Sequence, residues 1–148
     1  MKQTCRDLMT KEPFCCTASE SVQRVAQLMQ DQDVGSIPVC DGPDSKLLIG
    51  IVTDRDLVLK IVAQGRHPAS IPVGDVMTRQ IFSCHPDDDL EGVLESMERH
   101  QVRRIPVVDQ QNRLVGIVAQ ADIATKLKNA QKTGEVVGEI SRTSARSA

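Results

Sequence analysis

The sequence contains almost no aromatic residues. Neither tryptophan nor tyrosine occurs among its 148 residues, and Phe14 and Phe82 are the two phenylalanines. Proteins that bind single-stranded nucleic acid usually stack bases on aromatic rings, so this mode of binding has little support here. The core must therefore be built from valine, isoleucine, leucine and methionine.

An excess of charge of one sign is also lacking. The formal net charge is −2 and no long basic run appears, so we see no phosphate-neutralising surface of the kind that binds nucleic acid. No apolar run is long enough to cross a bilayer, and residues 1–13 lack the apolar part of a secretion signal. We therefore expect a cytoplasmic protein that binds neither nucleic acid nor membrane.

The five cysteines, Cys5, Cys15, Cys16, Cys40 and Cys84, show no CxxC spacing. In a reducing cytosol we interpret them as small buried hydrophobic residues. A zinc or redox site built from Cys84-His85 and His100 remains an alternative, although no two ligand pairs have structural-zinc spacing. A chain of this length buries a sufficient core without disulfides or metal, so we expect no required cofactor.

The sequence repeats itself. After a shift of 68 residues, which falls to 66 beyond residue 109, the matching pairs include Met9-Thr10 with Met77-Thr78, Ile37-Pro38-Val39 with Ile105-Pro106-Val107, Gly50 with Gly116, and Asp56 with Asp122. The change of shift falls in a turn rich in Gly, Pro, Asp and Ser, where length changes are tolerated. The chain is therefore an internal duplication.

Each copy shows the same local pattern, strand, helix, strand, strand, helix. Apolar residues at i, i+3, i+4 and i+7 predict the first helix of each copy, and runs flanked by turn residues predict paired strands. The expected elements are short strands near Phe14 and Phe82, helices over 22–29 and 90–97, strands at 36–40, 47–53, 105–109 and 114–119, and helices beginning near Asp54 and Gln120. The helix over 54–64 is apolar nearly all round, so it should meet the other repeat or a second subunit.

These residues resemble a tandem pair of CBS domains, the regulatory unit called a Bateman module. The resemblance rests on the Met-Thr opening, the Ile-Pro-Val strand, and the closing phrases GIVTDRD and GIVAQAD. It implies CBS domain 1 at 3–64, a connector at 65–71 and CBS domain 2 at 72–128, followed by a tail at 129–148 with a short helix over 135–140. The sequence is similar to stand-alone members of the family, since no catalytic or transport domain is attached.

The resemblance implies an α/β (α+β) fold in which duplicated β-α-β-β-α repeats pack as a pseudo-twofold discoid module. It also implies two clefts for adenosine-containing ligands and pairing into a homodimer. The residue types suit this role, because a hydroxyl residue before a helix N-terminus can bind phosphate. An aspartate in the first turn can accept hydrogen bonds from ribose. A plainer alternative is that Asp56 and Asp122 only offset the helix dipole.

In the family each cleft takes residues from both repeats. Carried over by position, the first cleft contains Thr53, Arg55, Asp56, Thr78, Ile81, Ser83, Val102, Arg103 and Arg104. Its arginines could reach phosphate, or they could form a solvated cationic edge.

The second cleft contains Thr10, Pro13, Cys15, Val34, Gly35, Ser36 and Asp122. Ala119 here matches Thr53, and Gly35-Ser36 matches the arginine pair. We therefore expect a second cleft that binds weakly, takes a less charged adenosine derivative, or stays empty.

The leading hypothesis is a non-enzymatic regulatory module that binds AMP, ADP, ATP, S-adenosylmethionine or a dinucleotide. Occupancy would reach an unidentified protein through a shift between two subunit arrangements. The alternative is a ligand-free dimeric adaptor with vestigial clefts. An enzyme is disfavoured because we find no nucleophile elbow, P-loop, HExxH motif or convincing acid/base pair.

Overall fold

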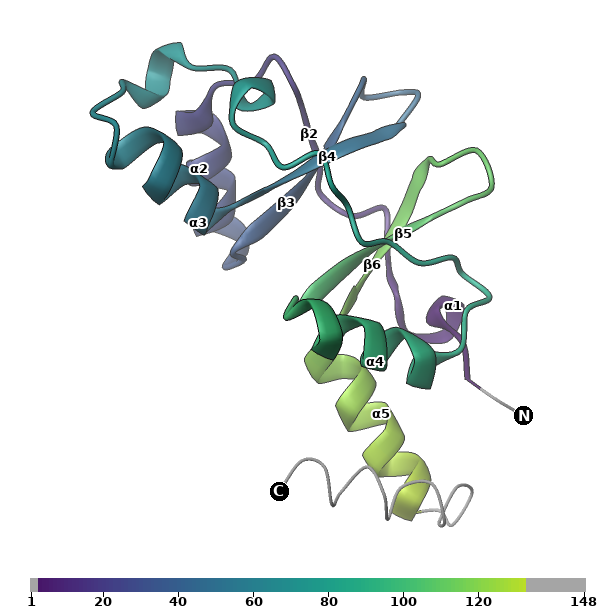
Figure 1. The fold of residues 1–148 in the computed structure, drawn as a ribbon. Helices are drawn as coiled ribbons and strands as arrows, with labels where there is room; N and C mark the ends of the chain where they lie inside the picture. Colours follow the sequence, from purple (N-terminus) through teal and green to yellow (C-terminus); the bar gives the residue numbers. More distant parts are fainter. Residues whose placement is uncertain (1–2, 133–148) are drawn as a thin grey trace.

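The computed structural model describes residues 3–132. Two three-stranded sheets lie at its centre, with strand orders β2-β3-β4 and β1-β6-β5, and helices flank each sheet (Figure 1). The elements are α1 (Cys5–Leu8), β1 (Thr10–Lys11), β2 (Cys16–Thr17), α2 (Val22–Gln32), β3 (Ser36–Cys40), β4 (Leu48–Thr53), α3 (Asp54–Leu57), a π-helical turn η1 (Val58–Val62), the 3-10 turns η2 (Pro68–Ser70) and η3 (Val73–Asp75), α4 (Leu90–His100), β5 (Arg104–Val108), β6 (Leu114–Ala119) and α5 (Gln120–Lys132). The predicted mixed α/β fold class is confirmed.

Most predicted elements are present in both repeats. The strand expected near Phe14 forms as β2, which pairs in parallel with β3. The one expected near Phe82 is reduced to a single bridge between Cys84 and Val107. Pro86 follows closely and has no N–H to continue the pairing. The helix expected over 135–140 lies outside the described residues.

The two long helices begin where predicted and run three residues beyond their predicted ends. The Ser21 hydroxyl accepts a hydrogen bond from the Arg24 N–H at 3.1 Å and caps α2. Helix α2 ends at Asp33, with φ of 54°, and α4 ends at the matching Gln101, with φ of 56°. The predicted apolar stripe of α4 is buried, and that of α2 is buried except for Ala26, which is exposed. Four of the five cysteines are also buried, as expected, and Cys15 is half-buried.

The opening segment of each repeat packs on the other repeat. Strand β1 pairs with β6 of the second repeat, and Thr78 pairs in the same way with Ile51 of the first. The core of the second repeat includes Cys5, whereas the core of the first includes Val73 and the two residues Val76 and Met77. Each hydrophobic core is therefore completed by residues from the other half of the chain.

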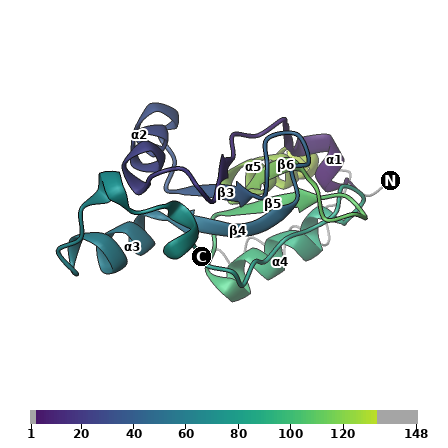
Figure 2. The ribbon, with the colours of Figure 1, turned by 90° about the horizontal axis from the view of Figure 1, so that it is seen from above.

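The two sheets also join at their hairpin ends. The Leu48 N–H donates to the Asn112 carbonyl at 3.0 Å, and the Leu114 N–H donates to the Lys46 carbonyl at 2.8 Å. Lys46 and Asn112 occupy matching positions, and both have positive φ. Seen from above, α2 and α3 lie together at one end of the molecule, next to β3 and β4 (Figure 2). These reciprocal contacts give the pair its pseudo-twofold arrangement.

The helix predicted over 54–64 is not a regular α-helix. After α3 the chain continues as the π-helical turn η1, in which the Ala63 N–H donates to the Val58 carbonyl at 2.8 Å. The turn leaves Val58, Leu59 and Val62 exposed by 54%, 47% and 71%. Within residues 3–132, no helix has both the length and the apolar character needed to span a bilayer.

Candidate functional site

The closing phrase of the first repeat forms the start of α3. The Thr53 hydroxyl accepts a hydrogen bond from the Asp56 N–H at 3.1 Å, and the Asp56 carboxylate accepts one from the Thr53 N–H at 3.0 Å. This reciprocal capping box fixes both side chains at the end of β4. Because the Thr53 hydroxyl acts only as an acceptor in this pair, its proton remains able to donate to a ligand.

Asp56 is buried, with 8% of its surface exposed, and it is the one buried charged residue in the described part of the chain. The Thr78 hydroxyl donates to its carboxylate, with both oxygen distances at 3.2 Å. Lys60 lies 3.1 Å from the same carboxylate and donates to the Val76 carbonyl at 2.8 Å. The opening segment of the second repeat thus meets Asp56 of the first, as predicted for a shared cleft.

This arrangement restricts what Asp56 can do. Its carboxylate already accepts from the Thr53 N–H, the Thr78 hydroxyl and the Lys60 ammonium group. Pairing and hydrogen bonds offset the desolvation cost of burying this carboxylate. A ribose hydroxyl could bind Asp56 at its remaining acceptor site or by replacing one of these partners.

The other residues assigned to the first cleft are more scattered. Arg55 and Arg103 are exposed, and the Arg103 carbonyl accepts the Gln120 N–H that begins α5. Ile81 and Val102 are half-buried. Ser83 lines a separate cavity of about 310 Å³ beside α4.

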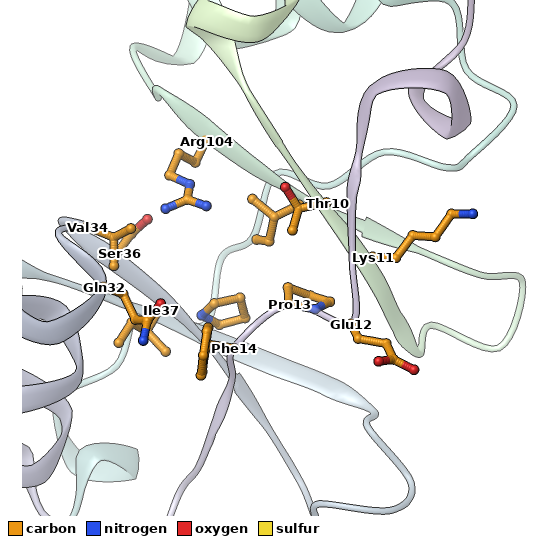
Figure 3. Close-up of a pocket in the computed structure, with 12 residues that line it drawn as sticks. Thr10, Lys11, Glu12, Pro13, Phe14, Gln32, Val34, Ser36, Ile37 and Arg104 are labelled. Carbon is orange, nitrogen blue, oxygen red and sulfur yellow. The ribbon is translucent and has the colours of Figure 1, made fainter.

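A cavity of about 370 Å³ lies between the two repeats at the second cleft. Its lining is Thr10, Lys11, Glu12, Pro13, Phe14, Gln32, Val34, Ser36, Ile37, Pro38, Arg104 and Ile117. The lining residues come from the opening segment, the end of α2 and the start of β3 in the first repeat, together with strands β5 and β6 of the second (Figure 3). The structure therefore brings together four of the residues predicted for this cleft, Thr10, Pro13, Val34 and Ser36.

Arg104 lines this second cavity, although the sequence assigned it to the first cleft. Its side chain extends toward Ser36, whereas the charged ends of Lys11 and Glu12 point away from it (Figure 3). The Arg104 Nε atom is buried and has no hydrogen-bond partner among the described residues. Arg104 of the second repeat thus supplies a positive charge to this cleft. Strand β3 of the first repeat also lines the cleft but contains no lysine or arginine.

Three predicted residues of the second cleft do not line the cavity. Asp122 is exposed in the first turn of α5. Cys15 is half-buried, and the Gly35 carbonyl accepts the Asp54 N–H at 2.9 Å. Lys60 was not predicted from the sequence as a partner of Asp56. The match of Lys60 with Lys126 in the duplication, and its i,i+4 spacing from Asp56, were the available signals.

The family model for the CBS domain matches the chain at residues 5–63 and again at 73–129. The chain therefore belongs to the CBS-domain family and carries a tandem CBS pair. The CBS domain-containing protein YhcV of Bacillus subtilis (strain 168) is 38% identical over 136 residues, which cover 92% of this chain and 94% of that protein.

Two crystal structures show the same fold. Hypoxic Response Protein I, with two coordinated zinc ions, is 38% identical, with 83% of this chain and 98% of that chain covered and a TM-score of 0.73. The CBS domain pair of MJ0100, in complex with 5′-methylthioadenosine and S-adenosyl-L-methionine, is 26% identical, with 87% and 98% covered and a TM-score of 0.74. CBS pairs thus include modules that bind adenosine-containing molecules. Across residues 3–132 of this chain, no three His, Cys, Asp or Glu residues group as metal ligands.

Proposed function

We propose that this protein is a cytoplasmic regulatory module that binds an adenosine-containing ligand between its two repeats. The observation that carries the proposal is the second cavity, where Thr10 and Ser36 of one repeat meet Arg104 of the other. Its volume of about 370 Å³ falls in the range of small-molecule sites. The complex of the MJ0100 pair with two adenosine compounds supports this ligand class.

The cavity offers complementary chemistry for such a ligand. Pro13, Ile37 and Ile117 provide an apolar surface on which an adenine ring can lie. The hydroxyls of Thr10 and Ser36 can donate to a polar group of the ligand. Arg104 can pair with a phosphate or carboxylate, and its buried Nε would then gain the partner that it lacks.

The first cleft would accept a ligand by an exchange of partners. A ribose hydroxyl can replace the Thr78 hydroxyl at Asp56, and Lys60 can turn from Asp56 toward a phosphate. Each exchange gives up a contact that the unliganded protein already makes, so the net gain is small. We therefore propose unequal clefts, as expected from the sequence, but in the opposite order: the tighter site is the second cleft, which contains Arg104, and not the first.

A ligand-free dimeric adaptor is the second candidate. It is favoured by Asp56, whose carboxylate already accepts from three groups of the protein itself. On this interpretation Asp56 is a structural cap that holds Thr78, and both clefts are vestigial. A sensor, by contrast, requires a ligand that binds two arrangements of a homodimer with different affinities. It also requires a regulated protein, not yet identified, that distinguishes these two arrangements.

Thermal unfolding with AMP, ADP, ATP and S-adenosylmethionine separates the two candidates. A ligand at about 100 times its Kd raises the free energy of unfolding by about 2.7 kcal/mol, and the midpoint rises accordingly. We expect this rise with at least one of the four ligands. Arg104→Gln should abolish the rise or reduce it strongly, whereas Arg103→Gln should leave it unchanged because Arg103 is exposed.

Asp56→Asn provides the second comparison, because it keeps the side-chain shape while removing the charge. A rise that survives Asp56→Asn and is lost in Arg104→Gln assigns binding to the second cavity. If none of the four ligands moves the midpoint of the unmodified protein, the adaptor takes precedence.

A further inference from the structure

Two cysteines from different halves of the chain lie in contact inside the second repeat. The Sγ atoms of Cys5 and Cys84 are 3.4 Å apart, and both residues are buried. Cys5 belongs to helix α1 in the opening segment, whereas Cys84 bridges to strand β5. Nothing in their sequence spacing indicates this pair, because the exchange of opening segments brings them together.

Backbone hydrogen bonds hold the pair in place. The Cys5 N–H donates to the Asp88 carbonyl at 3.0 Å, and the Arg6 N–H donates to the Pro86 carbonyl at 2.8 Å. On the other side, the Cys84 N–H donates to the Pro106 carbonyl at 3.0 Å. The main-chain geometry of two elements therefore holds the two cysteines next to each other.

A small molecule can approach this pair from the side of Cys84. Cys84 lines the cavity of about 310 Å³ beside α4, together with Ser83, Gly92 and Ser96. A hydroperoxide fits in such a space, whereas a bulky disulfide would have to open the protein. The cavity thus favours small oxidants over exchange with large thiols.

The two thiols also differ in proton affinity. The hydrogen bond from Cys84 lowers the pKa of Cys5, while burial and the nearby Asp88 and Asp89 act against it. The same contact raises the pKa of Cys84. Burial raises the pKa of Cys16 and Cys40 to about 12, so both remain thiols.

We propose that Cys5 and Cys84 are a redox modification site, where a hydroperoxide converts the two thiols into a reversible disulfide. The thiolate of one cysteine attacks one peroxide oxygen and the O–O bond breaks, which leaves a sulfenic acid on that cysteine and releases water or an alcohol. The sulfur of the other cysteine then attacks the sulfenic sulfur, the S–O bond breaks, and water leaves with the thiol proton. The two thiols lose two electrons and two protons in all, and the peroxide gains them.

The bond fastens α1 to the second repeat. In the reduced protein α1 is held by hydrogen bonds to the loop after Cys84 and by an exposed ion pair between Arg6 and Asp87. A disulfide closes a chain segment from residue 5 to residue 84, and a long closed segment restricts the unfolded chain strongly. The oxidised protein should therefore unfold at a temperature about 10 °C higher.

The test treats the full-length protein with hydrogen peroxide, blocks the remaining thiols by alkylation after unfolding, and maps the disulfides by mass spectrometry. We expect a peptide pair joined through Cys5 and Cys84, lighter by two hydrogen atoms, and its loss after dithiothreitol. Cys40→Ala, the matched control, should keep both this link and the rise in unfolding temperature. Cys5→Ala should lose both.

The unmodified protein alone decides the outcome if a variant folds poorly. The proposal is overturned if Cys5 and Cys84 are both fully alkylated at peroxide doses that oxidise Cys15. It is also overturned if either residue forms a disulfide with another cysteine instead. A Cys5–Cys84 link that leaves the unfolding temperature unchanged overturns the fastening role.

Discussion

At the scale of single residues, two glycines determine how closely the repeats approach each other. A Cβ atom on Gly50 would lie 2.6 Å from Met77 Sδ, and one on Gly116 would lie 2.6 Å from Met9 Sδ. The Met-Thr opening and the glycine of the closing phrase are thus two sides of one contact. Each methionine comes from one repeat and covers the glycine of the other.

Gly50→Ala should destabilise the protein by about 1–3 kcal/mol, because the added methyl group overpacks a buried site. Met77 is 7% exposed, and the Thr78 carbonyl lies 3.2 Å from the new Cβ, so the site has little room to adjust. Gly92→Ala is the control, since nothing lies within 4 Å of its Cβ in α4. That change should stabilise the helix by up to about 1 kcal/mol. Urea unfolding measures both, and equal midpoints would contradict the packing argument.

At the scale of elements, the π-helical turn after α3 creates an apolar surface. Val58, Leu59 and Val62 are all large and exposed, whereas the matching residues of α5 are Ala124, Thr125 and Lys128. Exposed apolar patches on a soluble domain usually mark an interaction surface. We expect this surface to pair with a second copy of the chain and to form a homodimer.

Leu59→Glu should convert the dimer to a monomer, because a buried unpaired carboxylate at the interface is strongly unfavourable. Sedimentation velocity over a range of protein concentrations measures the change. Thr125→Glu, at the matching position of α5, should leave the dimer intact. Circular dichroism of both variants checks that the fold is kept. A monomeric unmodified protein, or a Leu59→Glu variant that still dimerises, would exclude this surface as the interface.

The sequence predicted the elements better than their contacts. Helices α2 and α4 and both hairpins followed from periodicity and from the duplication, because local patterns fix local structure. The π-helical turn could not be predicted, because its apolar sequence is equally typical of a buried α-helix. Arg103 and Arg104 were assigned together to the first cleft. Arg103 lies in the bend before β5 and is exposed, whereas Arg104 is the first residue of β5 and lines the second cavity.

At the scale of the whole molecule, the exchange of opening segments makes each half depend on the other. Residues 67–148 alone would lack strand β1 and the core residue Cys5, and residues 1–66 alone would lack Val73, Val76 and Met77. Each half would expose part of its core without these segments, and small domains have little stability to spare. The duplicated sequence unit is therefore not the unit that folds.

This dependence predicts how the two halves behave when they are produced separately. Neither residues 1–66 nor residues 67–148 should show a cooperative thermal transition alone, whereas the mixed halves should form a one-to-one complex that does. Gel filtration and circular dichroism measure both properties. The control is the intact chain cut at a protease site inserted between Arg66 and His67, which are both exposed; it should remain associated and folded. If an isolated half melts cooperatively, its own residues complete its core. The exchanged opening segments would then be needed to form the clefts and not to stabilise the fold.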